Sequence, residues 1–268
     1  MAETLSVSLN QHRFLVTAGR HDARWKSMIE GQWLSSSEPN TFKLFDRFLQ
    51  EGNWMLDVGA FIGQTALYAA AKGVHVVALE PDPLAFAELQ NNIALNPELA
   101  GRVQAIHGAL SGEEGTLTLG APEEGGGAAS SFLFTAGKTT WQVQGMTIGS
   151  VVQKSGLTRC QFVKMDIEGA EYWVVPAMAD FLRTQRPTLF LSFHFPILMK
   201  DATGKNRGLL YRRLTRIPKL FFSMLPVVRA IAHYKYIVDE EGTPISLLSL
   251  LFKRHNTLVA TDQAWVAP

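Results

Sequence analysis

The chain has 268 residues, of which 47% are hydrophobic and 18% are charged, a balance typical of a globular protein rather than a disordered one. Its 25 Lys and Arg residues against 24 Asp and Glu residues leave a formal net charge of +1, so no global field attracts nucleic acid. The single cysteine, Cys160, excludes an internal disulfide and a cysteine-based zinc site. This composition fits a reducing compartment, and we expect a cytoplasmic protein.

No secretory signal is expected, because residues 1–20 lack a basic stretch followed by a continuous apolar one. The most apolar region, 217–232, contains Lys219, Pro226 and Arg229 and is shorter than the roughly 20 residues that span a bilayer. Basic residues precede it closely. The segment 200–232 could therefore rest on an anionic membrane surface, although packing on the domain with solvated charges is the favoured interpretation.

The order of elements predicts a parallel sheet after a short N-terminal extension. Residues 1–50 read as a strand pair around Leu5–Thr17 followed by a helix at 40–50. Strands and helices then alternate: strand 54–58, helix 65–72, strand 74–79, helix 81–92 with Asp82 as its cap, and strand 103–107. Such alternation is typical of a parallel sheet with helices on both faces.

An insertion at 112–149 interrupts this pattern. It contains two short expected strands, at 116–119 and 142–146, around a Gly/Ala/Ser-rich stretch at 121–131 that is typical of a loop. The pattern then resumes with strand 161–165, helix 169–182, strand 188–193, the basic helical segment 200–232, and a closing strand pair at 234–238 and 257–261 around a short apolar helix. We therefore expect residues 51–268 to form one α/β domain.

The stretch Asp57 to Gly63 (DVGAFIG) is expected to bind a cofactor, because it joins a strand to a helix and ligands bind outside the carboxyl ends of such strands. Gly59 allows a sharp backbone turn, and Gly63 allows the helix to approach the strand. Glu80 ends the next strand, where its carboxylate can accept both ribose hydroxyl hydrogens. Together these residues predict an adenosine-containing cofactor.

Phe61 indicates which cofactor this is. A dinucleotide fingerprint places its second glycine at this position so that pyrophosphate can approach the backbone, and a bulky side chain argues against that. S-adenosylmethionine (SAM) has no phosphate, and Thr65 at the helix start could bind its carboxylate. A nicotinamide-dependent oxidoreductase and a non-catalytic binding protein on the same fold are the alternatives.

A second motif, Lys164 to Glu171 (KMDIEGAE), places Asp166 at the carboxyl end of a strand on the same edge. His194 follows the next strand and is predicted to lie beside Asp166, where it could act as a general base. Alternatively, Asp166 and His194 could hold a divalent metal, although spacing alone fixes no third ligand. Glu168 could contact the acceptor or only favour the helix start.

Ser130 and Ser131 end the glycine-rich loop and offer hydroxyl groups, so they are candidate acceptor contacts. A surface insertion without a function is the equally weighted alternative.

These stretches resemble the FkbM family of SAM-dependent methyltransferases between Glu38 and Pro196. The resemblance rests on DVGAFIG with TALYAA, on VVALEPDPLAFAELQNNIALN, on HGALSGEEGTLTL and on FVKMDIEGAEYWVV. It implies a Rossmann-like sheet of seven mostly parallel strands, with the last strand antiparallel beside the fifth. It also implies a cofactor site formed by Glu38, Asp57, Gly59, Ala60, Phe61, Gly63, Thr65, Glu80, Pro81, Ala109 and Asp166.

The activity that this resemblance implies is O-methylation of a hydroxyl group, commonly on a sugar or a secondary metabolite. Ala109 and Leu110 would lie near the adenine, Asp166 near the methionine end, and Thr41 above the site. The expected partner is a small-molecule or saccharide acceptor rather than nucleic acid, and self-association into a homo-oligomer is left open.

Overall fold

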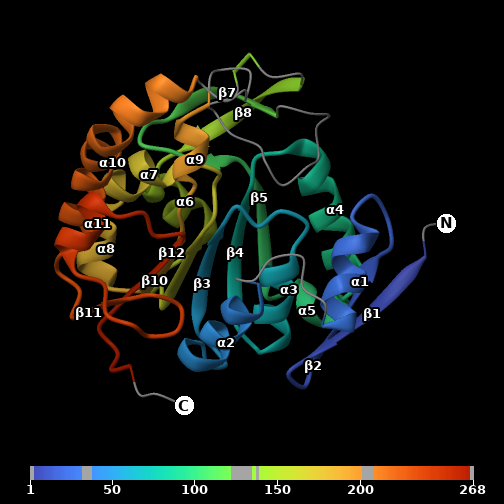
Figure 1. The fold of residues 1–268 in the computed structure, drawn as a ribbon. Helices are drawn as coiled ribbons and strands as arrows, with labels where there is room; N and C mark the ends of the chain where they lie inside the picture. The colour runs from blue at the N-terminus through green and yellow to red at the C-terminus, as the bar shows by residue number, and fades with distance from the viewer. Residues whose placement is uncertain (1–2, 32–37, 122–134, 137–138, 201–207, 266–268) are drawn as a thin grey trace.

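The computed structural model describes residues 3–31, 38–121, 135–136, 139–200 and 208–265, and of residues 38, 39 and 209–214 it describes the backbone alone (Figure 1). A seven-stranded sheet forms its centre. From one edge to the other the strands are β11 (Tyr236–Val238), β12 (Thr257–Thr261), β10 (Thr188–Ser192), β9 (Phe162–Met165), β3 (Trp54–Val58), β4 (His75–Glu80) and β5 (Val103–His107).

Strands β10, β9, β3, β4 and β5 pair in parallel, whereas β12 runs antiparallel to both of its neighbours, β10 and β11. This confirms the predicted α/β class and the antiparallel last strand beside the fifth parallel one. The strands begin or end within two residues of the predicted limits, because short apolar runs bounded by glycine or polar residues mark buried strands clearly.

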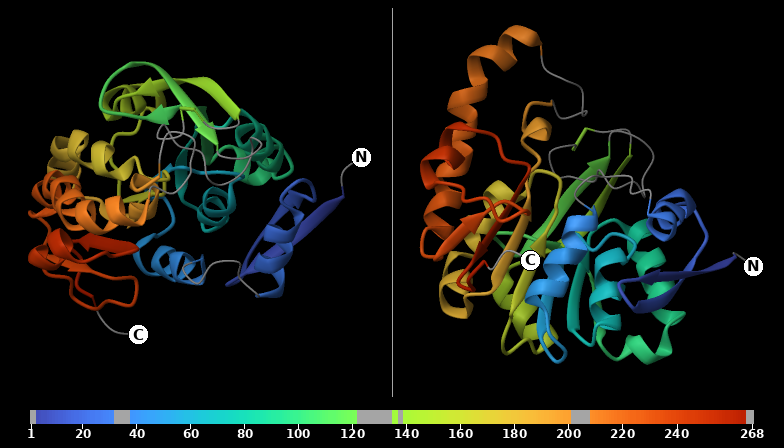
Figure 2. Two further views of the ribbon diagram at one scale, coloured as in Figure 1. Left: turned by 45° about the horizontal axis from the view of Figure 1, so that its top comes forward. Right: turned by 60° about the horizontal axis from the view of Figure 1, so that its bottom comes forward.

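Helices cover both faces of the sheet (Figure 2). Along β3, Met55 packs with the helices of one face, whereas Leu56 and Val58 pack with those of the other, as alternation along a strand requires. The first face carries α2 (Glu38–Phe48), α3 (Gln64–Ala71) and α4 (Pro83–Ala94); the second carries α6 (Ile148–Ser155), α7 (Glu171–Ala177), α8 (Ala179–Gln185), α10 (Leu209–Ile231) and α11 (Leu247–Phe252). The short helices α5 (Pro97–Ala100) and α9 (Phe195–Leu198) complete the connections.

The N-terminal extension packs on the first face of the sheet. Its strands β1 (Thr4–Leu9) and β2 (His12–Thr17) form the expected antiparallel hairpin. The N–H groups of Leu15 and Thr17 donate to the side chains of Asn96 and Asn92, at 2.7 and 2.9 Å, so the hairpin is tied to the end of α4. The helix that follows, α1 (Asp22–Glu30), was not predicted, since its few apolar positions give it little amphipathic pattern.

The insertion forms a small separate sheet of β6 (Ala109–Leu110), β8 (Thr139–Met146) and β7 (Gly115–Ala121), at the top in Figure 1. The two predicted strands are therefore confirmed. Most of the glycine-rich stretch, with Ser130 and Ser131, lies outside the described residues.

The single helix predicted at 169–182 is wrong, because two helices, α7 and α8, meet at Met178. Pro176 lies in the last turn of α7 and has no N–H for the helical ladder, which favours a break there. In the basic segment, α10 confirms the expected helix, and no helix among the described residues is long and apolar enough to cross a bilayer. Contact of the segment 200–232 with a membrane surface stays a prediction.

The turn after β3 approaches β9 so closely that only glycine fits at its start. Gly59 has a φ of +81°, and a Cβ on it would collide with the backbone carbonyl oxygen of Asp166. The N–H of Asp166 donates to the Val58 carbonyl at 3.0 Å, which fixes the two strand ends against each other. The carboxyl ends of β3 and β9 therefore form one continuous edge.

Replacing Gly59 with alanine should destabilise the protein by about 2–4 kcal/mol, because both the left-handed backbone and the collision resist a Cβ. Gly31→Ala is the matched control: its φ is +69°, but nothing lies within 4 Å of the added Cβ. Gly31→Ala should lower the free energy of unfolding by about 1 kcal/mol or less. Urea unfolding of both variants measures the difference, and equal losses would contradict the proposed close approach.

Candidate active site

A pocket of about 780 Å³ lies at the carboxyl edge of the sheet, a size typical of ligand sites. The predicted residues on its wall are Gly59, Ala60, Phe61, Thr65, Glu80, Pro81, Ala109, Asp166, Glu168 and His194. Thr41 and Leu110 also line it. The side chains of Glu38, Ser130 and Ser131 lie outside the described residues. Most of the sites inferred from separate stretches of sequence thus share one cavity.

Asp57 and Gly63 do not lie on the pocket wall, which corrects their expected direct contact with a cofactor. Asp57 is fully buried, and its Oδ2 accepts a 2.6 Å hydrogen bond from the Thr65 hydroxyl. At Gly63, a Cβ would come within 2.7 Å of Leu89 Cδ1 in α4, so this glycine allows close packing against α4 rather than the predicted approach of the helix to the strand. Both residues support the cofactor loop from behind.

Hydrogen bonds of Glu80 link the end of β4 to the loop that follows β3. Its Oε2 accepts the Phe61 N–H at 2.7 Å, and its Oε1 accepts the Asp82 N–H at 2.8 Å. Each carboxylate oxygen has a second lone pair, so both can still accept a ligand hydroxyl. The side chain is 5% exposed, and burial raises the pKa of Glu80 to about 7.

Phe61 forms part of the pocket wall together with the N-terminal extension. Its φ of +52° is unusual for a bulky residue, and its ring makes an edge contact with His21 at 4.7 Å between centroids. The Arg24 guanidinium lies 5.5 Å from the centroid of the Phe61 ring and also lines the pocket. Sequence reasoning missed Arg24, because only the docking of α1 on the domain brings it there.

Lys164 is a second residue that sequence reasoning did not single out. It is the one charged side chain of β9, yet it is 8% exposed. Its Nζ donates to the Gly59 carbonyl at 3.0 Å and lies 3.4 Å from Asp57 Oδ1. Burial lowers the pKa of Lys164, but the charges of Asp57, Asp166 and Glu80 raise it above its ordinary value. The signal in the sequence that could have identified this residue was a lysine inside an otherwise apolar strand.

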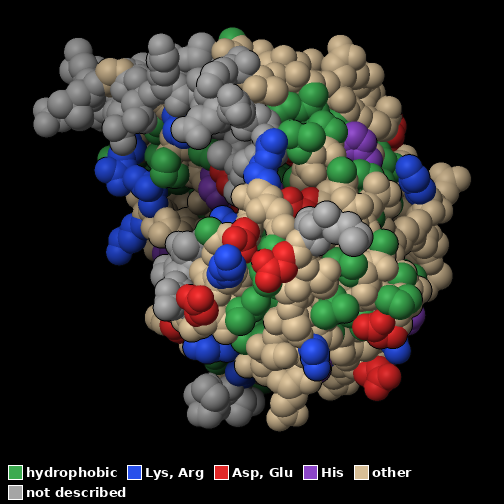
Figure 3. Space-filling model, turned by 90° about the vertical axis from the view of Figure 1, so that its right-hand side faces the viewer, with side chains coloured by type: hydrophobic (Ala, Val, Ile, Leu, Met, Phe, Trp, Pro, Cys, Tyr) green, Lys and Arg blue, Asp and Glu red, His purple; other side chains and the backbone are tan. Residues whose placement is uncertain are grey.

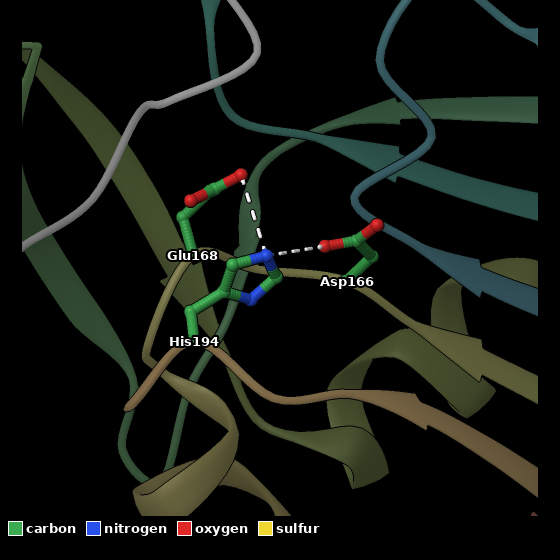
Figure 4. Close-up of side chains that lie close together, drawn as sticks. All are labelled: Asp166, Glu168 and His194. Carbon is green, nitrogen blue, oxygen red and sulfur yellow. Dashed lines mark ion pairs between the residues drawn. The ribbon is translucent and has the colours of Figure 1, made fainter. Parts of the chain in front are cut away.

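His194 lies beside Asp166, as predicted, and Glu168 approaches the same ring nitrogen (Figure 4). The distances from His194 Nε2 are 3.4 Å to Asp166 Oδ1 and 3.6 Å to Glu168 Oε1. On its other side, Nδ1 makes a 2.9 Å hydrogen bond with Glu171, which is fully buried and also accepts the Ile167 N–H. Three carboxylates therefore surround one imidazole.

This arrangement controls the charge of the imidazole. Burial lowers the pKa of His194, but the hydrogen bond with Glu171 and the charges of Asp166 and Glu168 raise it to about 9. Burial raises the pKa of Glu168 to about 7. At neutral pH the imidazole therefore carries a proton, and the general-base role expected for His194 requires that proton to leave first. Glu168, with a pKa of about 7, is a neighbouring group that can exchange a proton near neutral pH.

Removing the charge of Lys164 should destabilise the fold strongly, because Asp57 would remain buried without a counter-ion. For Lys164→Met we expect a loss of about 3–5 kcal/mol in the free energy of unfolding. Arg183→Ala, which breaks the exposed pair with Asp180, should cost less than about 1 kcal/mol. Denaturant titration compares the two variants, and similar small losses would show that the buried pair does not hold the loop.

Comparisons with known proteins agree with these features. The methyltransferase FkbM domain matches residues 57–221, more than half of the chain. The methyltransferase sdnD of Sordaria araneosa is 29% identical over 163 residues, which span 49% of this chain and 62% of that protein.

Two solved structures are similar at lower identity. The FkbM methyltransferase of Methylobacillus flagellatus matches with a TM-score of 0.45 and 17% identity, over 77% of this chain and 42% of that one. A TehB-like SAM-dependent methyltransferase of Corynebacterium glutamicum matches with a TM-score of 0.45 and 12% identity, over 90% of this chain and 94% of that one. The family match over residues 57–221, which includes the glycine loop, Glu80 and the Asp166–His194 edge, establishes that the chain belongs to the FkbM family of methyltransferases.

Proposed function

We propose that the protein transfers a methyl group from SAM to a hydroxyl group of a sugar, a glycan or a secondary metabolite. One observation carries this proposal: the glycine loop with Glu80 and the carboxylate–imidazole cluster with His194 face the same pocket of about 780 Å³. Such a pocket can hold a cofactor and an acceptor side by side. Membership of the FkbM family supports SAM as the methyl donor.

The cofactor would occupy the half of the pocket formed by β3 and β4. Glu80 keeps a free lone pair on each oxygen for the two ribose hydroxyl groups. Asp57 holds the Thr65 hydroxyl at the start of α3, where free backbone N–H groups favour a carboxylate such as that of methionine. Ala109 and Leu110 would provide an apolar wall for the adenine.

The acceptor would lie toward Asp166, Glu168 and His194. In the transfer, the bond between the methyl carbon and sulfur breaks as a bond to the hydroxyl oxygen forms, and the hydroxyl proton passes to this cluster. Holding the two reactants in line supplies much of the rate enhancement, and a proton acceptor within hydrogen-bond distance adds about 10²–10⁴-fold. The product S-adenosylhomocysteine then leaves without the sulfonium charge.

A small or saccharide acceptor also fits the surface better than nucleic acid does. The chain has a net charge of only +1. On the face shown in Figure 3, acidic and basic side chains lie next to one another over the centre and the lower half. Binding to a phosphate backbone requires a gathered basic surface instead.

The affinity for S-adenosylhomocysteine should decrease as the pH falls from 8 to 6. With a pKa of about 7, Glu80 is mainly ionised at pH 8 and mainly protonated at pH 6, where it loses acceptor capacity. We expect about a tenfold increase in Kd by calorimetry. Glu80→Gln should bind more weakly and show little change over this range. A constant Kd in the unmodified protein would contradict the role of Glu80.

Methyl transfer itself is tested with SAM and a panel of glycosides, by the release of S-adenosylhomocysteine. Substituting His194 with alanine should reduce turnover by about 100-fold or more while the affinity for S-adenosylhomocysteine stays within about twofold. His75→Ala is the control, since His75 begins β4 at the opposite edge of the sheet and stacks on Trp54.

Three results would contradict the proposal in different ways. Unchanged turnover in His194→Ala would remove His194 from the transfer step. Stabilisation of the protein against heat by NAD and not by SAM would favour the oxidoreductase. Tight binding of SAM without transfer to any hydroxylated acceptor would favour a non-catalytic binding protein.

A further inference from the structure

His194 Nε2 lies at ion-pair distance from two carboxylates at once. The nitrogen lies 3.4 Å from Asp166 Oδ1 and 3.6 Å from Glu168 Oε1, so it approaches both oxygens without making a hydrogen bond of ordinary length to either (Figure 4). By contrast, Nδ1 of the same ring makes a 2.9 Å hydrogen bond with Glu171. The Nε2 side of the ring therefore faces a gap between two carboxylates.

We propose that this gap binds a divalent cation through Asp166, Glu168 and His194. Nitrogen and oxygen ligands lie about 2.0–2.2 Å from Zn²⁺, Mg²⁺ and similar ions, which puts neighbouring ligands about 3.0–3.5 Å apart. The three ligand atoms here lie within 4.8 Å of one another, and the two separations from Nε2 are close to this range. Small side-chain rotations are enough to bring all three to one ion.

The second coordination shell supports this assignment. Imidazole ligands of metals usually donate their other N–H to a carboxylate, which fixes the ring and makes the ligating nitrogen more basic. Glu171 is the carboxylate in this position. It is fully buried, its Oε1 lies 2.9 Å from His194 Nδ1, and the same oxygen accepts the Ile167 N–H at 3.1 Å. It is thus a positioning residue that points Nε2 toward the two carboxylates.

The charge of the cluster also favours a cation. Asp166, Glu168 and Glu171 bring three carboxylates around a single imidazole, and the side chains of Glu168, His194 and Asp166 are 20%, 25% and 38% exposed. The charges of Lys164 and Lys200 also act on Asp166 and Glu168. A divalent ion held between the two carboxylates would balance their charge at closer range, where solvent screens charges poorly.

Two carboxylates and one imidazole suit Mn²⁺ or Zn²⁺, and three protein ligands leave coordination positions open. The inference rests on the proposed function at this point: one or two oxygens of the acceptor would fill those positions. The ion would then lower the pKa of the bound hydroxyl group and orient it toward the methyl donor. Acceptors with two adjacent hydroxyl groups would be favoured, because both oxygens can bind one ion.

Titration with Mn²⁺ alone, followed by the loss of the electron paramagnetic resonance signal of free Mn²⁺, tests the site without any acceptor. We expect one Mn²⁺ per chain. Glu168→Gln and His194→Ala should weaken its binding at least tenfold, and Glu171→Gln about 10–100-fold through the orientation of the ring. Glu98→Gln is the matched control, because Glu98 is an exposed carboxylate in α5 and should leave binding unchanged.

Calorimetry with S-adenosylhomocysteine on the same samples verifies that each variant is folded and tests the cofactor site separately. In the unmodified protein, electron spin-echo modulation from a coordinated imidazole nitrogen should accompany bound Mn²⁺. The metal site is overturned if Mn²⁺ does not bind, binds equally to Glu168→Gln, or shows no nitrogen modulation. If Mn²⁺ binds as expected but S-adenosylhomocysteine does not, the metal site stands and the proposed methyl transfer fails.

Discussion

The buried ion pair between Lys164 and Asp57 is the interaction on which the pocket depends. It joins the end of β9 to the end of β3 where the chain leaves the sheet, and the two side chains are only 10% and 0% exposed. The same ammonium group donates to the Gly59 carbonyl, and the same carboxylate accepts from Thr65. Burying two charges is unfavourable, and these hydrogen bonds offset part of that cost, although Asp57 Oδ1 has Lys164 as an ion-pair partner and accepts no hydrogen bond. Because every partner belongs to the glycine loop or to the helix that follows it, the pair fixes the part of the wall that faces the cofactor.

The two halves of the pocket differ in how they are held. On the cofactor side, Glu80 accepts backbone N–H groups at both oxygens, so the wall is rigid before any ligand arrives. On the acceptor side, charge dominates, with His194 between Asp166, Glu168 and the buried Glu171. Rigid donors and acceptors suit a ligand of constant shape such as an adenosine derivative. A charged cluster suits the proposed step in which a proton leaves the hydroxyl group of the acceptor.

The sequence predicted the central sheet well and the periphery less well. Short apolar runs that end at glycine, such as Trp54–Val58, favour a buried strand. Asp82 before Pro83 is a strong start signal for a helix, and in the structure Asp82 accepts the N–H groups of Leu84 and Ala85. Helix α1 escaped prediction because its own residues carry little amphipathic pattern and its stability comes from packing against the domain. The helix after β9 was predicted as continuous, although Pro176 ends its first part.

The sequence by itself determined the fold class, the glycine loop between β3 and α3 and the edge of the sheet at which Asp166 and His194 meet, since local patterns fix strands and the carboxyl ends of parallel strands gather at one edge. Only the tertiary structure decided that Asp57 lies behind the wall, that Arg24 lies on it, and that Glu168 joins His194 as a third candidate ligand. Direction and burial of a side chain depend on what packs around it from distant parts of the chain. Asp57 and Lys164 are 107 positions apart, so no local sequence pattern predicts their contact.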